Sequence, residues 1–255
     1  MTLGRALRIL ATETKYEFLK LVRLPGFAIP IVVFPLMFYM IFGLAFGRQR
    51  MGSATMATYL LATMGAFGVI GAALFGLGVT VAGERGQGWL TVKRASPMPM
   101  VTYFGAKVLM SMLFSAIIVA LLFVLGVTFG NVHLPAALWL KLAAALVLGA
   151  TPFCALGLAI GYLAGPNSAS PIVNMIHLPI AAASGLWMPL EVLPPFVRRI
   201  APALPPFHLS QLALGTIGLS PGSMTVHMIA LAGFAAGFLV LASIGYRRDE
   251  GRTYG

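Results

Sequence analysis

The sequence predicts an all-α membrane protein with six transmembrane helices, and three features lead to that prediction. Hydrophobic residues make up 59% of the 255 positions and charged residues only 9%. A soluble domain carries roughly 25% charged residues, so water alone cannot solvate the surface of a chain with this composition. Long runs contain no charged residue, and about 20 such residues suffice for a helix to cross the hydrocarbon core. The cations lie between these runs, where they can meet lipid headgroups.

The charge-free runs give the order of the spans, because a charge at the bilayer centre costs about 2.5–3.5 kcal/mol on insertion scales. The expected spans are residues 27–47, 57–82, 108–129, 142–163, 170–187 and 224–245. Residues 142–190 are free of charge throughout and would be about 74 Å long as a single helix, more than twice the bilayer core. We therefore expect the chain to turn back at the Gly-Pro-Asn-Ser segment 165–168.

Two segments outside the spans also have recognisable patterns. Residues 3–24 predict an amphipathic interfacial helix on the inner leaflet, serving as an anchor or contacting a cytoplasmic partner. Its apolar face is formed by Leu3, Leu7, Leu10, Thr14, Phe18 and Leu21. Residues 189–222 begin with six closely spaced prolines. Because a proline-broken span would leave backbone groups unsatisfied in lipid, we expect here a short outer re-entrant helical segment between spans five and six.

The distribution of cations predicts the orientation of the chain. Twelve Lys and Arg residues lie in the two terminal segments and in residues 83–107, against five on the other side. The positive-inside rule therefore places both termini and the 83–107 loop in the cytoplasm. The net charge of +11 is explained by this topology and by anionic headgroups, so we expect membrane lipid as a partner and no nucleic acid.

The chain lacks the common motifs of catalysis and nucleotide binding. It has no Gly-x-x-x-x-Gly-Lys-Ser/Thr loop, no His-Glu-x-x-His motif and no acidic residue inside an expected span. We therefore expect no catalytic residue, cofactor or metal site in this chain. Ser184 and His227 leave open an intramembrane serine protease, although a Ser and a His in an apolar bundle more often make packing hydrogen bonds.

The loop after the second expected span carries the first family motif. It reads Glu84-Arg85-Gly86-Gln87-Gly88-Trp89-Leu90, followed by Lys93-Arg94-Ala95-Ser96-Pro97. This loop resembles the coupling helix of ABC type-2 exporter permeases, which docks on the ATPase subunit. The family form is Glu-Arg-Glu/Arg-x-Gly-Thr-Leu, from which Gly86 and Trp89 depart. Without the resemblance, a solvated loop with ordinary positive-inside charges would be the simpler interpretation.

The resemblance assigns ATPase coupling to eight residues of the loop. They are Glu84, Arg85, Gly88, Trp89, Leu90, Lys93, Arg94 and Pro97. In this interpretation the charged residues offer mixed charge to an interface, while Trp89 and Leu90 supply an apolar anchor.

A second stretch near the C-terminus also matches the family. Residues 184–194 read Ser-Gly-Leu-Trp-Met-Pro-Leu-Glu-Val-Leu-Pro. They are similar to the family pattern Ser-Gly-aromatic-x-Pro-x-Glu-x-Leu-Pro, which precedes two short outer helices. The two motifs stand in the family order, and the resemblance covers essentially the whole chain.

The resemblance implies the function and the partners. It implies a permease subunit of an ATP-driven exporter for a drug, lipid or glycan, in a bacterial cytoplasmic (inner) membrane. Its partners would be two copies of a cytoplasmic ABC ATPase, which hold ATP and Mg, and a second permease copy or a homologous permease. The alternative is a carrier or channel that needs no ATPase.

The expected fifth span has a polar face formed by Ser170, Asn174, His177 and Ser184. Polar groups in a span face protein or water rather than lipid, so this face either borders a substrate path or makes interhelical hydrogen bonds. Family exporters are similar in using the first and fifth spans at the dimer interface and pathway. Phenylalanines in the first span, at 27, 34, 38, 42 and 46, are expected to pack or to face lipid. Glycines 157, 161 and 165 permit close helix approach by the fourth span.

Overall fold

Nearly all of the chain that the structure describes is helical. The computed structural model describes residues 3–51, 54–95, 98–220 and 222–250. The α-helices are α1 (Leu3–Val22), α2 (Pro25–Phe46), α3 (Met56–Ala73), α4 (Thr80–Gly86), α5 (Trp89–Ala95), α6 (Met100–Thr128), α7 (Ala136–Gly149), α8 (Thr151–Leu163), α9 (Ala169–Ala183), α10 (Pro195–Ile200), α11 (Pro205–Thr216) and α12 (Met224–Glu250). A π-helical segment, η1 (Leu74–Val79), joins α3 to α4, and two 3-10 turns are η2 (Leu190–Val192) and η3 (Ala201–Ala203). Strands β1 (Arg50–Met51) and β2 (Ala54–Thr55) pair antiparallel.

The predicted class, an all-α membrane protein, is confirmed by the length and composition of the helices. Five are long and apolar enough to cross a membrane: Pro25–Phe46, Met56–Gly86, Met100–Thr128, Ala136–Leu163 and Met224–Asp249. At the expected fifth span lies α9, which is apolar but has only 15 residues and ends four positions before residue 187. The helix stops because Ser184 leaves helical geometry and Gly185 adopts a φ of +77°, which favours glycine.

The expected cytoplasmic loop at residues 83–107 is largely helical. Helix α4 continues to Gly86, α5 follows after a short turn, and α6 already begins at Met100. The sequence prediction ended the second span before Glu84 and began the third after Lys107, because each of these residues carries a charge. In the folded chain these two charges bond to one another, so they need no exposure to water and the helices run past them.

A single helix, Met56–Gly86, forms the centre of the bundle. It is almost wholly buried, with α2, α6, α8, α9 and α11 packed around it. Helix α8 approaches it closely: a Cβ added at Gly157 would lie 2.9 Å from the carbonyl oxygen of Ala73, and one at Gly161 would lie 2.9 Å from Val81 Cβ. The small residues of the fourth expected span therefore serve a contact within this chain.

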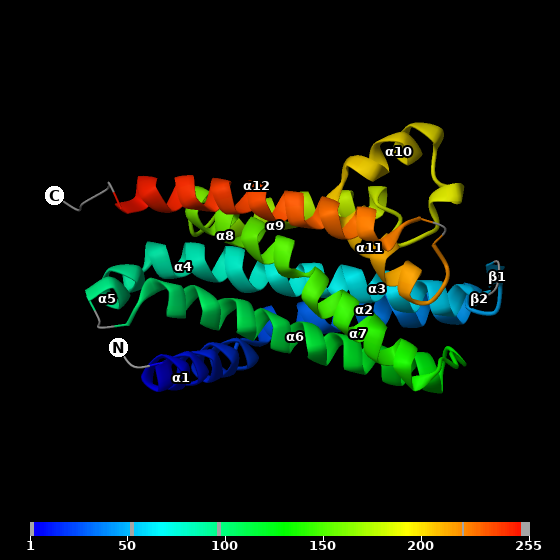
Figure 1. The fold of residues 1–255 in the computed structure, drawn as a ribbon, viewed down its shortest axis with the longest axis horizontal. Coiled ribbons are helices and arrows are strands. Elements are labelled where there is room, and N and C mark those ends of the chain that lie inside the picture. Colours follow the sequence, from blue (N-terminus) through cyan, green and yellow to red (C-terminus); the bar gives the residue numbers. More distant parts are fainter. Residues whose placement is uncertain (1–2, 52–53, 96–97, 221, 251–255) are drawn as a thin grey trace.

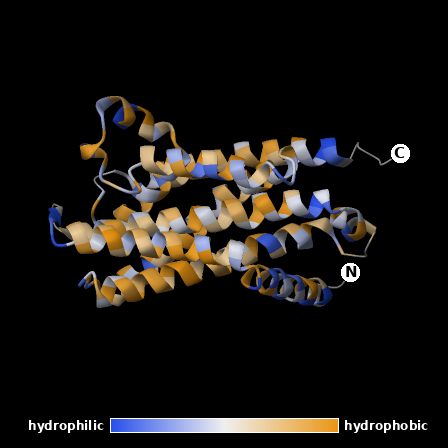
Figure 2. Cartoon of the chain, turned by 180° about the vertical axis from the view of Figure 1, so that it is seen from behind, coloured by the Kyte–Doolittle hydropathy of each residue, from blue (hydrophilic) through white to orange (hydrophobic). Residues whose placement is uncertain are grey.

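The bundle has two distinct ends. Helix α5 and both chain ends lie at one end, which we call the α5 end, while α10, α11 and the strand pair lie at the other, the α10 end (Figure 1). The most hydrophilic residues gather at these two ends, and apolar residues cover the helices between them (Figure 2). Large apolar side chains such as Leu44, Val124 and Val240 are exposed on the long helices α2, α6 and α12, as expected of a surface that faces lipid.

The segments expected outside the spans are also helical. Residues 189–222 contain η2, α10, η3 and α11; α11 packs against α3, α7 and α12, whereas α10 stands away from the bundle (Figure 1). Helix α1 packs on α6. It turns Thr14, Phe18 and Leu21 toward the protein and leaves Leu7 exposed. Much of its expected apolar face is therefore occupied by a contact within the chain.

Candidate functional site

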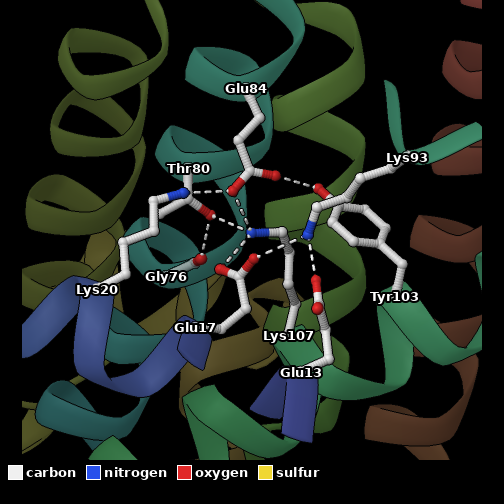
Figure 3. A network of polar contacts seen from close by, with 9 residues as sticks. All are labelled: Glu13, Glu17, Lys20, Gly76, Thr80, Glu84, Lys93, Tyr103 and Lys107. Carbon is white, nitrogen blue, oxygen red and sulfur yellow. Dashed lines mark hydrogen bonds and ion pairs between the residues drawn. The ribbon is translucent and has the colours of Figure 1, made fainter. Parts of the chain in front are cut away.

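A cluster of charged and polar side chains joins four helices at the α5 end (Figure 3). We call it the ion network. Its members are Glu13, Glu17 and Lys20 of α1, Thr80 and Glu84 of α4, Lys93 of α5, and Tyr103 and Lys107 of α6. The network therefore connects the segment expected to meet an ATPase with the N-terminal helix and two long helices.

Lys107 occupies the centre of the ion network. Its side chain is 0% exposed, and its Nζ lies 2.9 Å from Glu17 Oε2 and 3.0 Å from Glu84 Oε1. The same Nζ donates to Thr80 Oγ1 at 3.3 Å. A buried ammonium is tolerated only when it is paired and hydrogen-bonded, and both carboxylates are also only 5% exposed. The two carboxylates therefore stabilise the buried ammonium group of Lys107, and Lys107 stabilises the two carboxylates.

Glu84 has two further partners. Lys20 Nζ donates to Glu84 Oε1 at 2.6 Å, and the hydroxyl of Tyr103 donates to Oε2 at 2.5 Å. Both carboxylate oxygens are thus used inside the protein. The expectation that Glu84 presents its charge to a partner is not met in this conformation, because the carboxylate is held within the bundle.

Lys93 extends the ion network to α5. Its Nζ contacts a carboxylate oxygen of Glu13, lies 3.2 Å from Glu17 Oε1, and lies 4.5 Å from the centre of the Tyr103 ring. Burial alone would lower the pKa of Lys93, but the hydrogen bond to Glu13 and the charges of Glu17 and Glu13 raise it above its usual value. Lys93 is therefore a charged link between α5 and α1.

Arg85 makes a separate connection at the same end. Its guanidinium lies 2.9 Å from Asp249 Oδ1 of α12, and it donates to the carbonyl oxygens of Gly161 at 2.7 Å and Ala164 at 3.1 Å. These contacts fix the end of the central helix to α8 and α12. Like Glu84, Arg85 bonds within the protein rather than facing outward.

Helix α5 presents an apolar outer face. Gly88 adopts a φ of +75° in the turn before it, which explains glycine at this position. Leu90 is 3% exposed and belongs to the core, so it is not a free anchor, whereas Trp89 is 54% and Val92 61% exposed. Trp89 and Val92 therefore form an exposed apolar face at this end of the bundle. Pro97 and the side chain of Arg94 lie outside the described residues.

A groove of about 650 Å³ lies between α2, the central helix and α9. Six Phe and Trp side chains line it: Phe27, Phe34, Phe38, Phe67, Phe75 and Trp187. No Asp, Glu, Lys or Arg is among the described residues that line it. Three of the α2 phenylalanines, for which packing or lipid contact was favoured over a sugar-stacking track, thus line the groove.

The groove collects three of the four polar residues expected on one face. Ser170, Asn174 and His177 line it, whereas Ser184 is buried at the end of α9 and does not. Asn174 donates to the carbonyl of Ser170 at 3.2 Å, a contact within α9. His177 Nδ1 is buried and has no hydrogen-bond partner in the part of the chain that the structure describes. Interhelical hydrogen bonding therefore does not explain His177.

The π-helical segment links the groove to the ion network. Phe75 and Val79 of this segment line the groove, and Thr80 Oγ1 donates to the Gly76 carbonyl at 2.6 Å. Lys107 in turn contacts Thr80 (Figure 3). π-helical turns inside long helices are frequent at functional sites, and this one lies where the groove adjoins the ion network.

The Ser and His that suggested a protease are not paired. His227 Nδ1 lies 3.0 Å from His208 Nδ1, and Ser184 Oγ has no hydrogen-bond partner in the described part of the chain. The hydrogen bond between nucleophile and base that defines such a site is therefore missing here.

Sequence comparison gives two matches. A family model described as "ABC-2 type transporter" matches residues 10–218. A curated protein of Bacillus subtilis (strain 168), named "Putative transport permease YvfS", is 25% identical over 245 residues, which cover 96% of this chain and 99% of that protein.

Proposed function

The chain belongs to the ABC-2 type transporter family, and we propose that it is the permease subunit of an ATP-driven exporter. The observation that carries this proposal is the exposed face of α5, Trp89 and Val92, on a helix joined to the transmembrane bundle by the ion network. An exposed face on a helix that is bonded to the transmembrane bundle is what we expect of a subunit that receives its energy from another polypeptide.

The proposed partner is a cytoplasmic ABC ATPase, present in two copies and holding ATP and Mg. Trp89 and Val92 would insert into it as apolar anchors, since exposed aromatic residues are frequent hot spots of interfaces. Lys93 would add charge at the edge of this contact, and Arg94 stays a sequence-based candidate for the same role. Glu84 and Arg85 would act from inside, by holding α4 to its neighbours.

The proposed coupling runs along the central helix. Movement of α5 would pull on Lys93 and, through the shared carboxylates, on Lys107 and α4. The π-helical segment would absorb or release that movement next to the groove. Two-state rearrangement of such an element is a common basis of transport switching.

The groove is the proposed path for the cargo, a drug, lipid or glycan. Ser170, Asn174 and His177 would border it, and Ser184 would support the end of α9. Because α2 and α9 form its walls, a second copy of this chain or a homologous permease would face it. The proposed topology has six crossings, with α9 as the short one, and places both termini in the cytoplasm of a bacterium, across its inner membrane.

Purification of the tagged permease from its host membrane tests the proposal. We expect an ATP-binding subunit to co-purify and to hydrolyse Mg·ATP. Val92→Asp and Trp89→Ala should each reduce its retention and hydrolysis about tenfold, because they remove an interface anchor. Val192→Asp is the matched control, since Val192 is at least as exposed and lies at the opposite end. Undiminished hydrolysis in both α5 variants, or a folded permease without any ATPase, would reject the proposal in favour of a carrier or channel.

A further inference from the structure

We propose that His208 and His227 form an acid-sensitive latch between α11 and α12, at the α10 end of the bundle. The latch is closed while the two rings carry one extra proton or none, and it opens when both rings are protonated. It does not depend on what the chain transports. The proposed topology, in which the α10 end faces the outside, decides only which compartment's pH the latch senses.

The two rings of the latch meet through their Nδ1 atoms. His208 of α11 and His227 of α12 are each 8% exposed, and the two Nδ1 atoms lie 3.0 Å apart. His208 Nε2 lies 2.9 Å from the carbonyl oxygen of Pro202. A carbonyl only accepts, so His208 carries a hydrogen on Nε2 and a free lone pair on Nδ1. The Nδ1–H of His227 therefore donates to His208, and these two hydrogen bonds link η3, α11 and α12.

The closed latch accepts a first proton without losing a contact. That proton binds Nε2 of His227, which carries no hydrogen in the neutral pair. A Cβ added at Gly222 would lie 2.9 Å from this atom, so Nε2 points toward the exposed turn that precedes α12. Protonation there leaves both hydrogen bonds of the latch in place.

A second proton breaks the contact between the rings. It must bind His208 Nδ1, so two N–H groups and two positive rings would face one another across 3.0 Å. Burial also lowers the pKa of His208, although the hydrogen bond to Pro202 opposes that shift. The open form therefore binds one more proton than the closed form. Its population should rise about tenfold for each pH unit below about 6.5, the usual pKa of histidine.

The surroundings of the latch are apolar and supply no counterion. The rings of Phe207 and Phe234 contact it. The other titratable groups on elements packed against α11 and α12 are Tyr59 on α3, Lys141 on α7, Cys154 and Tyr162 on α8, and His177 on α9. Within the described chain, none of these bonds to either histidine, and neither do the exposed Glu191, Arg198 and Arg199. The response to acid is therefore assigned to the two rings themselves.

Opening of the latch should have a local effect. Leu209, next to His208, is 0% exposed and packs against Gly149 of α7. Ser220 donates to Gln211 at 2.7 Å and holds the turn that follows α11. Helix α11 therefore stays attached to the bundle, while the first turns of α12 lose their hydrogen bond to it.

Hydrogen exchange of the purified permease in lipid nanodiscs, at about pH 7.5 and about pH 4.5, tests the latch. An unfolded peptide measured alongside corrects each rate for the intrinsic effect of pH. We expect residues 224–232 to exchange at least about tenfold faster at the lower pH, because opening frees the first turns of α12. Peptides of α3 and α6 should stay within about twofold.

Two variants separate the latch from ordinary packing. His227→Asn keeps an amide donor for His208 and an oxygen that accepts from the protonated ring, so residues 224–232 should stay protected at both pH values. His208→Gln keeps a donor for the backbone carbonyl but removes the acceptor for His227, so the same residues should exchange fast at both. His133→Asn is the matched control, since His133 is an exposed histidine outside the latch, and it should respond to acid like the unmodified protein.

The dependence on pH decides the outcome. An acid response that is absent from the unmodified protein, kept by either latch variant or lost in His133→Asn would overturn the latch, as would equal acceleration in all helices. A response that both latch variants lose and the control keeps supports it. The experiment contains no ATPase or nucleotide, so its failure leaves the docking test of Trp89 and Val92 unaffected.

Discussion

The ion network and the groove both lie along the central helix, but their polar groups differ in whether they have partners. In the network, Glu84 and Lys107 are buried and bonded on all sides. In the groove, His177 and Trp187 each leave a buried nitrogen without a partner in the described chain. A paired buried charge stabilises the protein's own structure, whereas a buried polar atom without a partner leaves its hydrogen-bonding capacity unused.

The two regions also differ in how the central helix is held. Residues 80–86 are joined to α1, α6, α8 and α12 by ion pairs and hydrogen bonds. Residues 67–79 line the groove with aromatic and small side chains, and their last six residues form the π-helical segment that adjoins residues 80–86. The proposed coupling depends on this junction, because π-helical turns inside long helices are frequent at functional sites.

The largest effect should come from breaking the centre of the ion network. Lys107→Met leaves Glu17 and Glu84 buried without their shared counterion, so we expect the free energy of unfolding to fall by about 3–5 kcal/mol. Thermal and denaturant unfolding in detergent measure this loss. Adding Glu17→Gln and Glu84→Gln to the same variant removes the two buried carboxylates that lost this lysine and should recover part of the stability, although Lys20 and Lys93 then each lose a carboxylate partner. A single variant as stable as the unmodified protein would contradict the pairing.

Two adjacent residues of α5 should separate packing from docking. Leu90→Ala removes a buried side chain and should lower the free energy of unfolding by about 2–3 kcal/mol. Trp89→Ala changes an exposed side chain and should alter stability by no more than about 0.5 kcal/mol, while still reducing coupled ATP hydrolysis. Unfolding curves and hydrolysis rates are measured on both variants. The distinction fails if Trp89→Ala unfolds as readily as Leu90→Ala.

A smaller effect should follow from the Arg85 connection. Arg85→Ala leaves the carbonyls of Gly161 and Ala164 without this donor, and we expect a loss of about 1–3 kcal/mol. Asp249→Asn removes only the partner's charge and leaves both carbonyl contacts, so its loss should stay below about 1 kcal/mol. Unfolding midpoints rank the two variants. The reverse ranking would show that the ion pair, not the carbonyl contacts, fixes the end of α4.

Much of the helix order follows from sequence, because lipid excludes charge and the charge-free runs must lie in helices. The ends of the helices do not follow so simply. Glu84 and Lys107 were placed outside the expected spans, although each lies in a continuous helix. Lys107 pairs with Glu84 and Glu17, which lie 23 and 90 positions away in the sequence, and no local pattern specifies such contacts. The spacing of Glu13, Glu17 and Lys20 on one face of α1 was the available signal.

The candidate sites show the same limit: local helical geometry follows from the sequence, but contacts between distant segments do not. Helical periodicity correctly brought Ser170, Asn174 and His177 to one wall, because it depends only on local geometry. It failed for Ser184, since the helix ends at Ala183 and the next residue points elsewhere. Which of Trp89 and Leu90 faces outward depends on how α5 rests on its neighbours. The contribution of Trp187 to the groove depends on how the turn after α9 folds back over α2.

The smallest effect should be a dependence of stability on alkaline pH through Lys93. The folded protein raises the pKa of Lys93, so its contribution is fully present below the unfolded pKa and is lost as the pH rises through the folded value. We expect Lys93→Met to lower the free energy of unfolding by roughly 1 kcal/mol or less, because the side chain is partly exposed. This difference from the unmodified protein should stay constant between about pH 7 and about pH 10 and shrink above that range. Denaturant unfolding of both proteins at each pH gives the difference directly. A difference that already shrinks near neutrality would mean that Glu13 and Glu17 do not hold Lys93 in its charged form, and that α5 is joined to the ion network by packing alone.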